Sequence, residues 1–330
     1  MKVQKILGVI LSVATISCGG AFAQTKTPSR HYSAAAQSSV KPFLGRWDLT
    51  LKTPKGDAPS WLGLSDMDGK LKATMVGRWG GACPAAKVDV RGGVLTCASP
   101  KEGDCDTNVV FNGKLEHGRL VGSAEGPNGA HWTWTGRRAP ALIRKSPPKW
   151  GAPVKLFNGK NLDGWHEFTA GYFPVSGHWT VVDGLLISPG NGPELATDRK
   201  FNDFKLHVEF KLGPNSNSGV YLRGRYEVQI ENESADEPPS HHTGGIYGFL
   251  APHPELPRTT DKWQSYDITL IGRRVTVVQD GTTVIDNKTI PGITGGAINS
   301  DEAAAGPIYV QGSEKGHVSF RNIVITPAEE

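Results

Sequence analysis

The chain is poor in cysteine, in methionine and in long apolar runs. Of its 330 residues only four are cysteine and three are methionine. No set of cysteines has the spacing of a structural zinc site. The most apolar run, Ile6–Ile16, is too short to cross a bilayer as a helix, so no membrane span is expected. No internal repeat of solenoid or propeller period is present.

An excess of charge of one sign is also lacking. The 36 Lys and Arg residues nearly balance the 32 Asp and Glu residues, which leaves a formal net charge of +4. The sequence has no basic stripe with interleaved aromatic residues, the pattern that indicates a nucleic-acid surface. We therefore expect no nucleic-acid partner.

The N-terminus has the three regions of an export signal. Lys2 and Lys5 precede the apolar run, and the small residues "AFA" at 21–23 fit a cleavage site before Gln24. Residues 1–23 are therefore predicted to be a signal peptide, and the mature protein to be periplasmic or secreted. Cys18 leaves a lipoprotein anchor open as the alternative, although Thr15 stands where such signals usually have Leu.

Three cysteines remain after the predicted cleavage. Export permits a disulfide, and an odd number leaves at least one cysteine without a partner in the chain. Cys97 and Cys105 would close a short loop, and this pairing is our prediction for the disulfide, with Cys83 left over.

Glycine, proline and tryptophan are abundant, whereas long helical patterns are few. The chain has 41 Gly, 23 Pro and nine Trp, and short strand patterns separated by turn signals run along most of it, so an all-β protein is expected. The stretch "SPPKWGAP" at 146–153 divides these strands into two groups. The predicted parts are a tether at 24–40, a small antiparallel β-barrel accessory domain at 41–145, a linker at 146–152 and a second β domain at 153–330.

In the first domain, turn signals recur at the spacing of an antiparallel meander. They are "DG" at 68, "GG" at 92 and "NG" at 112, and each predicts a hairpin turn. Four tryptophans are expected to pack in its core, with a ligand cavity as the alternative. They are Trp47, Trp61, Trp132 and Trp134.

The stretch "NSGVYLRGRYEVQI", residues 217–230, predicts a hairpin with two different faces. A three-residue loop centred on Gly224 places Val220 opposite Val228 on the apolar face and Tyr221 opposite Glu227 on the polar face. A two-residue loop would mix apolar and charged side chains on both faces. The polar face is either a solvated surface or the floor of a binding site.

Eight motifs of the second half occur together and in order. They are "KLFNGKNLDGWH", "WTVVDGLL", "ELATDRKFNDFKLHVEF", "NSGVYLRGRYEVQI", "GGIYG", "KWQSYDITLIG", "GPIYVQG" and "FRNIVITP". With them, residues 153–327 resemble the 3-keto-disaccharide hydrolase family. The resemblance implies a concanavalin A-like antiparallel β-sandwich that binds carbohydrate on a concave sheet. It also implies cleavage of the glycosidic bond of a sugar oxidised at C3.

The resemblance, combined with strand alternation, gives a set of candidate site residues. Expected as catalytic groups are Glu227, Glu194 and Arg223. Expected as substrate-binding groups are Asn217, Tyr221, Gln229, His207, Glu209, Tyr247, Tyr309 and Gln311. His241 and His242, in a long loop, are candidate ligands of a divalent metal, which is left open as a cofactor.

One segment departs from the family pattern. Relatives commonly have "QGDHG" where this chain has "QGSEKG" at 311–316, so Ser313 and Glu314 replace an aspartate and a histidine. Two alternatives to a 3-keto-glycoside enzyme stay open, and the change favours the first of them. One is a lectin-like binding protein without turnover, and the other is an ordinary glycosidase with two catalytic carboxylates.

Overall fold

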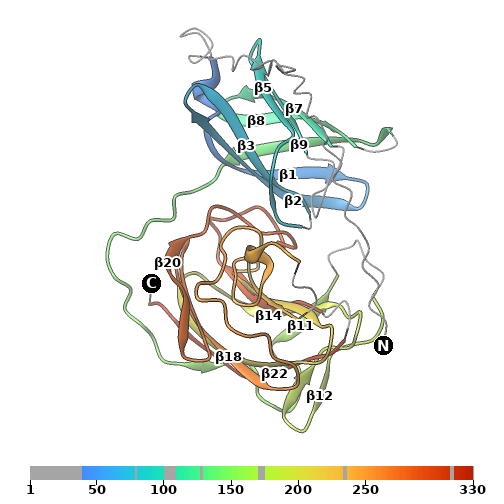
Figure 1. Cartoon of the computed structure of the whole chain (residues 1–330), viewed down its shortest axis with the longest axis vertical. Helices are drawn as coiled ribbons and strands as arrows, with labels where there is room; N and C mark the ends of the chain where they lie inside the picture. The colour runs from blue at the N-terminus through green and yellow to red at the C-terminus, as the bar shows by residue number, and fades with distance from the viewer. Residues whose placement is uncertain are drawn as a thin grey trace, which may run out of the picture. The chain divides into compact units, whose positions relative to one another are not determined.

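The computed structural model describes residues 39–78, 80–99, 109–126, 129–169, 175–232, 236–312 and 316–329. The predicted signal peptide, most of the tether, Cys105, Ser313 and Glu314 lie outside these ranges. The described residues form one compact unit. It is built almost entirely from antiparallel strands, which confirms the all-β prediction (Figure 1). Within the described ranges, no helix has the length and apolar character needed to span a membrane.

The first half is a single nine-stranded meander that curls on itself. Its strand order is β4-β3-β2-β1-β9-β8-β7-β6-β5, and β3 contacts β5, so the two ends of the sheet approach each other as in a barrel. Alternation along β1 sends Trp47 and Leu49 into the core and Asp48 to the outside. The strands are β1 Gly45–Thr53, β2 Gly56–Met67, β3 Lys70–Val76, β4 Ala82–Pro84, β5 Lys87–Arg91, β6 Val94–Ala98, β7 Val110–Glu116, β8 Arg119–Glu125 and β9 His131–Arg138.

Two of the three predicted barrel turns are confirmed and one is wrong. Asp68 and Gly92 each begin a pair of residues with positive φ between two strands. Asn112 and Gly113, however, lie inside β7, and the turn comes at His117. The glycine of this "NG" pair serves packing, because a Cβ at Gly113 would lie 2.5 Å from the Trp134 ring.

The predicted cysteine pairing is also wrong. Cys97 is free and buried in the barrel core, where burial raises the pKa of its thiol to about 12. Cys83 is the residue that takes part in a disulfide. Alternation decides this, because Cys97 on β6 points inward among apolar side chains of the barrel core.

The second half is a sandwich of two antiparallel sheets. The larger sheet has the order β12-β13-β22-β15-β18-β19-β20, with β10 beside β22, and the smaller sheet has the order β11-β14-β21-β16-β17. The strands of the larger sheet are β10 Val154–Lys155, β12 Thr180–Val182, β13 Leu185–Ile187, β15 Phe204–Leu212, β18 Trp263–Ile271, β19 Arg274–Gln279, β20 Thr282–Thr289 and β22 Val318–Pro327. Those of the smaller sheet are β11 Trp165–Phe168, β14 Glu194–Phe201, β16 Asn217–Leu222, β17 Tyr226–Glu231 and β21 Gly306–Val310.

The core of the sandwich lies between these two sheets. Leu206, Val208 and Phe210 come from the larger sheet, and Val220 and Val228 come from the smaller one. Each set alternates with polar residues along its strand, so every strand buries one face and turns the other away from the core. Two residues of the barrel strands, Trp61 and Val76, join this cluster. Trp47 and Trp134 pack in the barrel core as expected.

The hairpin of β16 and β17 has the predicted register. Val220 lies opposite Val228 and Tyr221 lies opposite Glu227, with residues 223–225 as the loop. Both Arg223 and Gly224 have positive φ. A one-residue slip would have moved the apolar set out of the core, which explains why the pattern predicted the register correctly.

The long segment after this hairpin covers the outer edge of β17. Gln229 exchanges backbone hydrogen bonds with Gly244 and Gly245, and the backbone N–H of Tyr247 donates to the carbonyl oxygen of Glu227. Ile246 is completely buried in the sandwich core. The segment therefore protects a sheet edge that would otherwise expose unpaired backbone groups.

Candidate functional site

The face of the smaller sheet that points away from the core carries a row of aligned side chains. Ala196 on β14 lies opposite Tyr309 on β21, Tyr309 opposite Tyr221 on β16, and Tyr221 opposite Glu227 on β17. Alternation places Glu194 on the same face as Ala196. We call this surface the site face.

Two tyrosines at its centre hold one another and the carboxylate of Glu227. The rings of Tyr221 and Tyr309 are stacked, with centroids 3.9 Å apart and planes inclined by 12°. The Tyr221 hydroxyl donates to Oε2 of Glu227 at 2.7 Å. Glu227 is only 3% exposed, so the predicted carboxylate is present on the predicted face but is far more buried than a solvated strand would leave it.

Gly219 makes room for this carboxylate. A Cβ at position 219 would lie 2.3 Å from Oε1 and 2.9 Å from Cγ of Glu227. The space above this glycine is therefore filled by the cross-strand glutamate.

Glu194 and Gln311 lie at the other side of the tyrosine pair. Oε2 of Glu194 accepts a hydrogen bond of 2.8 Å from the backbone N–H of Gly312. Gln311 is buried, and its side-chain oxygen has no hydrogen-bond partner among the residues described. A buried acceptor without a donor is suited to a hydroxyl group of a bound ligand.

Both carboxylates influence the tyrosines electrostatically. Burial raises the pKa of Tyr221 well above its ordinary value, and the nearby charges of Glu227 and Glu194 raise it further. The pKa of Tyr309 is raised by the same causes, although Arg78 acts in the opposite direction. Both tyrosines therefore stay protonated at neutral pH and act as hydrogen-bond donors.

A backbone segment after β20 also borders the site face. The Tyr309 hydroxyl donates to the carbonyl oxygen of Gly296 at 2.6 Å. The Tyr221 hydroxyl lies 2.9 Å from the carbonyl oxygen of Gly295, which competes with Glu227 for its single proton. The backbone N–H of Glu227 donates to Thr294 Oγ1 at 3.1 Å. These contacts fix the orientation of both phenols before any ligand binds.

The barrel half contributes a residue that the sequence analysis missed. Arg78 lies just after β3, and its guanidinium donates to the carbonyl oxygen of Ala297 at 2.7 Å. The backbone carbonyl oxygen of Arg78 accepts a hydrogen bond from the N–H of Gly296. Its charge also acts on Tyr309. No sequence motif marked Arg78, because its place beside the site face depends on how the two halves pack.

Three of the predicted site residues lie elsewhere. Arg223 stands in the hairpin loop, where its guanidinium donates to the carbonyl oxygens of Glu302 and Ala304. His207 and Glu209 lie on β15 of the larger sheet, facing away from the core, so the core separates them from Glu227. His207 contacts Asp267, and Glu209 binds Arg321 and Asn322. Alternation gave their direction correctly but could not say which sheet holds β15.

The remaining predicted binding residues lie along the hairpin and in the segment that follows it. Gln229 is buried opposite Gly219, and Asn217 lies opposite Glu231 at the far end of the hairpin. Tyr247 is half-buried, and its ring stacks on His241 with centroids 4.2 Å apart.

The two loop histidines do not form a metal site together. Nδ1 of His241 lies 3.2 Å from Glu237, whereas Nδ1 of His242 lies 2.8 Å from Glu255. In the part of the chain that the structure describes, no group of three or more His, Cys, Asp or Glu is arranged to hold a metal ion. Among the described residues, the divalent metal that the sequence left open therefore has no ligand set.

The sandwich half of the chain matches a known protein family. Residues 152–326 match the model of the 3-keto-alpha-glucoside-1,2-lyase-like domain. The chain belongs to this family. The match extends over the whole sandwich and includes every strand of the site face, and it confirms the family indicated by the eight motifs.

Individual relatives are more distant. A curated 3-keto-disaccharide hydrolase from Bacteroides thetaiotaomicron is 30% identical over 92 residues, which are 25% of this chain and 31% of the relative. A crystal structure from Parabacteroides distasonis, provisionally assigned as a glycosyl hydrolase, is 26% identical with a TM-score of 0.43 and covers 61% of this chain and 98% of its own. A second one is 20% identical with a TM-score of 0.45, at 54% and 94% coverage. Both scores lie below 0.5, so the family assignment rests on the sequence match.

The packing at Gly219 gives a testable expectation. Replacing Gly219 by Ala should destabilise the protein by about 1–3 kcal/mol, the usual cost of overpacking, because the new methyl group would overlap the Glu227 carboxylate. Denaturant unfolding followed by tryptophan fluorescence measures this. The control is Gly118→Ala, because a Cβ at Gly118 would meet no atom within 4 Å. Any loss of stability in this control arises from the positive φ of Gly118 alone. A Gly219→Ala protein as stable as wild type would contradict the described position of Glu227.

Proposed function

We propose that this protein cleaves the glycosidic bond of 3-keto-glycosides such as 3-keto-disaccharides. The observation that carries the proposal is the pair of carboxylates, Glu194 and Glu227, around a stacked tyrosine pair on the site face of a chain that belongs to the 3-keto-alpha-glucoside-1,2-lyase-like family. The family match supports carbohydrates as the substrates of this protein. The oxidised C3 position and the mechanism are part of the proposal.

The chemistry of a 3-keto sugar matches these residue types. The C3 ketone acidifies the proton on C2, so a carboxylate can remove it as a general base. The electron pair left on C2 forms an enolate with the ketone and then expels the leaving group from C1, and water adds to the resulting double bond. The enolate oxygen needs a hydrogen-bond donor, and the leaving oxygen needs a proton.

The residues of the site face can fill these roles. Glu227 is the proposed base, with Glu194 as the second carboxylate. The tyrosines, which remain protonated because of their raised pKa values, hold the Glu227 carboxylate and the backbone of residues 295–296 in place, and Arg78 supplies a positive charge near Tyr309. Gln311, with its free side-chain oxygen, is suited to accept a hydrogen bond from a sugar hydroxyl.

One assay distinguishes this function from its two alternatives. The purified protein is incubated with a 3-keto-disaccharide and, separately, with the unoxidised parent sugar, and the released monosaccharides are quantified. We expect cleavage of the oxidised sugar only, because only its C2 proton is acidic. Cleavage of both would indicate an ordinary two-carboxylate glycosidase. Cleavage of neither would leave a carbohydrate-binding protein without turnover.

We further propose that the protein works outside the cytoplasm. The support is the basic, apolar and small-residue order of residues 1–23, with a mature N-terminus near Gln24. Mass spectrometry of the mature protein tests the choice between this N-terminus and a lipid-modified Cys18.

A further inference from the structure

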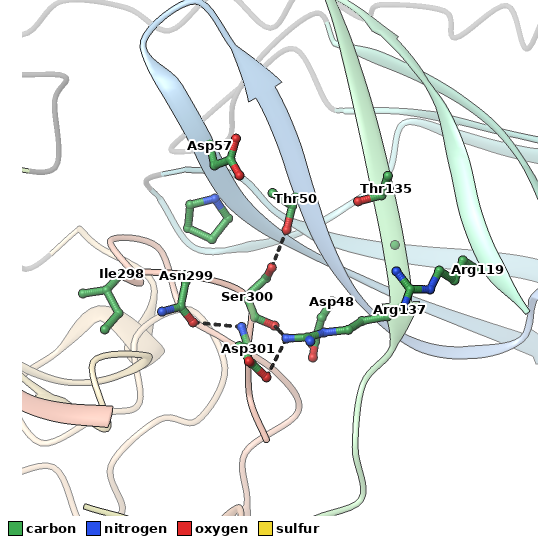
Figure 2. A pocket seen from close by; sticks show the side chains of 12 residues that line it. Asp48, Thr50, Asp57, Arg119, Thr135, Arg137, Ile298, Asn299, Ser300 and Asp301 are labelled. Atoms are coloured by element: carbon green, nitrogen blue, oxygen red, sulfur yellow. Dashed lines mark hydrogen bonds and ion pairs between the residues drawn. The ribbon is translucent and has the colours of Figure 1, made fainter. Parts of the chain in front are cut away.

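A polar cavity lies between the outside of the barrel and the segment 298–301. Its volume is about 350 Å³, which falls in the range of about 300–1,000 Å³ typical of small-molecule sites. Figure 2 shows Thr50 and Asp48 of β1 and Thr135 and Arg137 of β9 beside this segment. Ile298 lines the cavity and also packs against the Tyr221–Tyr309 cluster.

The walls of this cavity are fixed by contacts between the two halves of the protein. Thr50 and Ser300 share a hydrogen bond of 2.7 Å between their hydroxyls. The guanidinium of Arg137 donates to the carbonyl oxygen of Ser300 at 3.1 Å and forms an ion pair of 2.7 Å with Asp301. The cavity is therefore a preformed part of the fold.

Asp48 is the observation that points to a ligand. It lines the cavity and is only 1% exposed, and its one hydrogen-bond partner within the described ranges is the carboxyl group of Glu302, so no described donor reaches either of its oxygens. A buried polar group without a partner is costly and requires an explanation. A bound molecule with hydroxyl groups would supply the missing partners.

The other lining groups restrict the kind of ligand. Three carboxyl groups, on Asp48, Asp57 and Asp301, stand against two guanidinium groups, on Arg119 and Arg137. Asp48 keeps its proton up to about pH 8, so two carboxylates face two guanidinium groups and the lining favours neither an anion nor a cation. Within the described ranges no set of residues is arranged to hold a metal ion. Acceptors, donors and hydroxyls in nearly equal numbers suit a neutral molecule with many hydroxyl groups.

We propose that this cavity is a second carbohydrate site, which binds one sugar unit through its hydroxyl groups. The site is formed mainly by the barrel strands and is separate from the site face where cleavage is proposed. The apolar surfaces of Ile298 and Pro59 provide contacts for the C–H groups of a sugar ring. The barrel then has a role of its own in binding carbohydrate.

A pair of matched variants tests this site. Thr135 and Thr133 are both exposed and both face outward on β9, but only Thr135 lines the cavity. Thr135→Trp should fill the cavity, whereas Thr133→Trp should leave it open. Binding of trehalose, maltose and cellobiose is measured by calorimetry with full-length Glu227→Gln protein, so that turnover does not interfere. Sulfate and Ca²⁺ serve as probes for the competing ligand classes.

We expect at least one of these sugars to bind, Thr135→Trp to weaken that binding at least tenfold, and Thr133→Trp to leave it unchanged. The absence of sugar binding, binding of sulfate or Ca²⁺ instead, or equal effects of the two variants would each overturn the proposal. Turnover of a 3-keto-disaccharide by wild-type protein is measured separately, so a failure of the cavity proposal is distinguishable from a failure of the proposed function.

Discussion

Glu227→Gln should lower the turnover of a 3-keto-disaccharide by about 10²-fold or more while the protein stays folded. The factor is the usual contribution of a general base. Glutamine keeps the volume of the side chain and an oxygen that can accept the hydrogen bond from Tyr221, but it cannot take up the C2 proton. The apolar neighbours Tyr226 and Val228 are unaffected, because they point into the core.

The matched control is Glu209→Gln. Glu209 also lies on a β-strand and is bound to Arg321, but it stands on the outer face of the larger sheet. Its replacement should leave turnover unchanged, since the loss of a partly exposed ion pair costs about 1 kcal/mol of stability at most. Circular dichroism and thermal unfolding check that both variants are folded. If Glu227→Gln retains near-normal turnover, Glu227 is not the base, and Glu194→Gln becomes the decisive variant.

Asp48→Asn should make the protein more stable at pH 8 and remove part of the dependence of stability on pH. Burial raises the pKa of Asp48 from 3.8 to about 8, and the neighbouring carboxylate of Glu302 adds to this, whereas Arg137 and Arg46 act in the opposite direction. The folded protein thus keeps a proton on Asp48 that the unfolded chain releases near pH 4.

The sign of the effect follows from this difference. Between about pH 4 and pH 8 the folded state binds more protons than the unfolded state, so the free energy of unfolding falls as the pH rises. Each unit of rising pH in this window lowers the free energy of unfolding by up to about 1.4 kcal/mol. Asparagine has no proton to lose, so the stability gain of the variant should grow from pH 5 to pH 8.

Thermal unfolding at several pH values measures this gain. Asp66→Asn is the control, because Asp66 is an exposed carboxylate on β2. A constant difference between wild type and Asp48→Asn over the whole pH range would show that Asp48 titrates normally and that its carboxyl group is solvated.

Strand alternation predicted the site face well where the two faces of a strand differ in polarity. The register of the hairpin, with Tyr221 opposite Glu227, follows from the requirement that Val220 and Val228 share the core. The same rule gave the direction of His207 and Glu209 but not their sheet. Pairing between distant strands leaves no mark in a local pattern, so these two residues were assigned to a face on which they do not lie.

Burial on the site face was not predictable from the sequence. The polar alternation around Glu227 has the same appearance whether water or another segment lies beside it, and in this protein residues 294–296 contact Tyr221, Glu227 and Tyr309. The approach of Arg78 to Ala297 depends equally on packing between segments more than 200 residues apart.

The sequence by itself determined the all-β class, the family, the hairpin register and the presence of Glu227 on a polar face, because each depends on residues close together in the chain. Only the tertiary structure decided which carboxylates meet the tyrosine pair, that Cys97 is free, and that Asp48 is buried at a cavity beside the segment 298–301. The physical reason is that burial and long-range contact are set by the packing of whole sheets, whereas alternation specifies only which way a side chain points from its own strand.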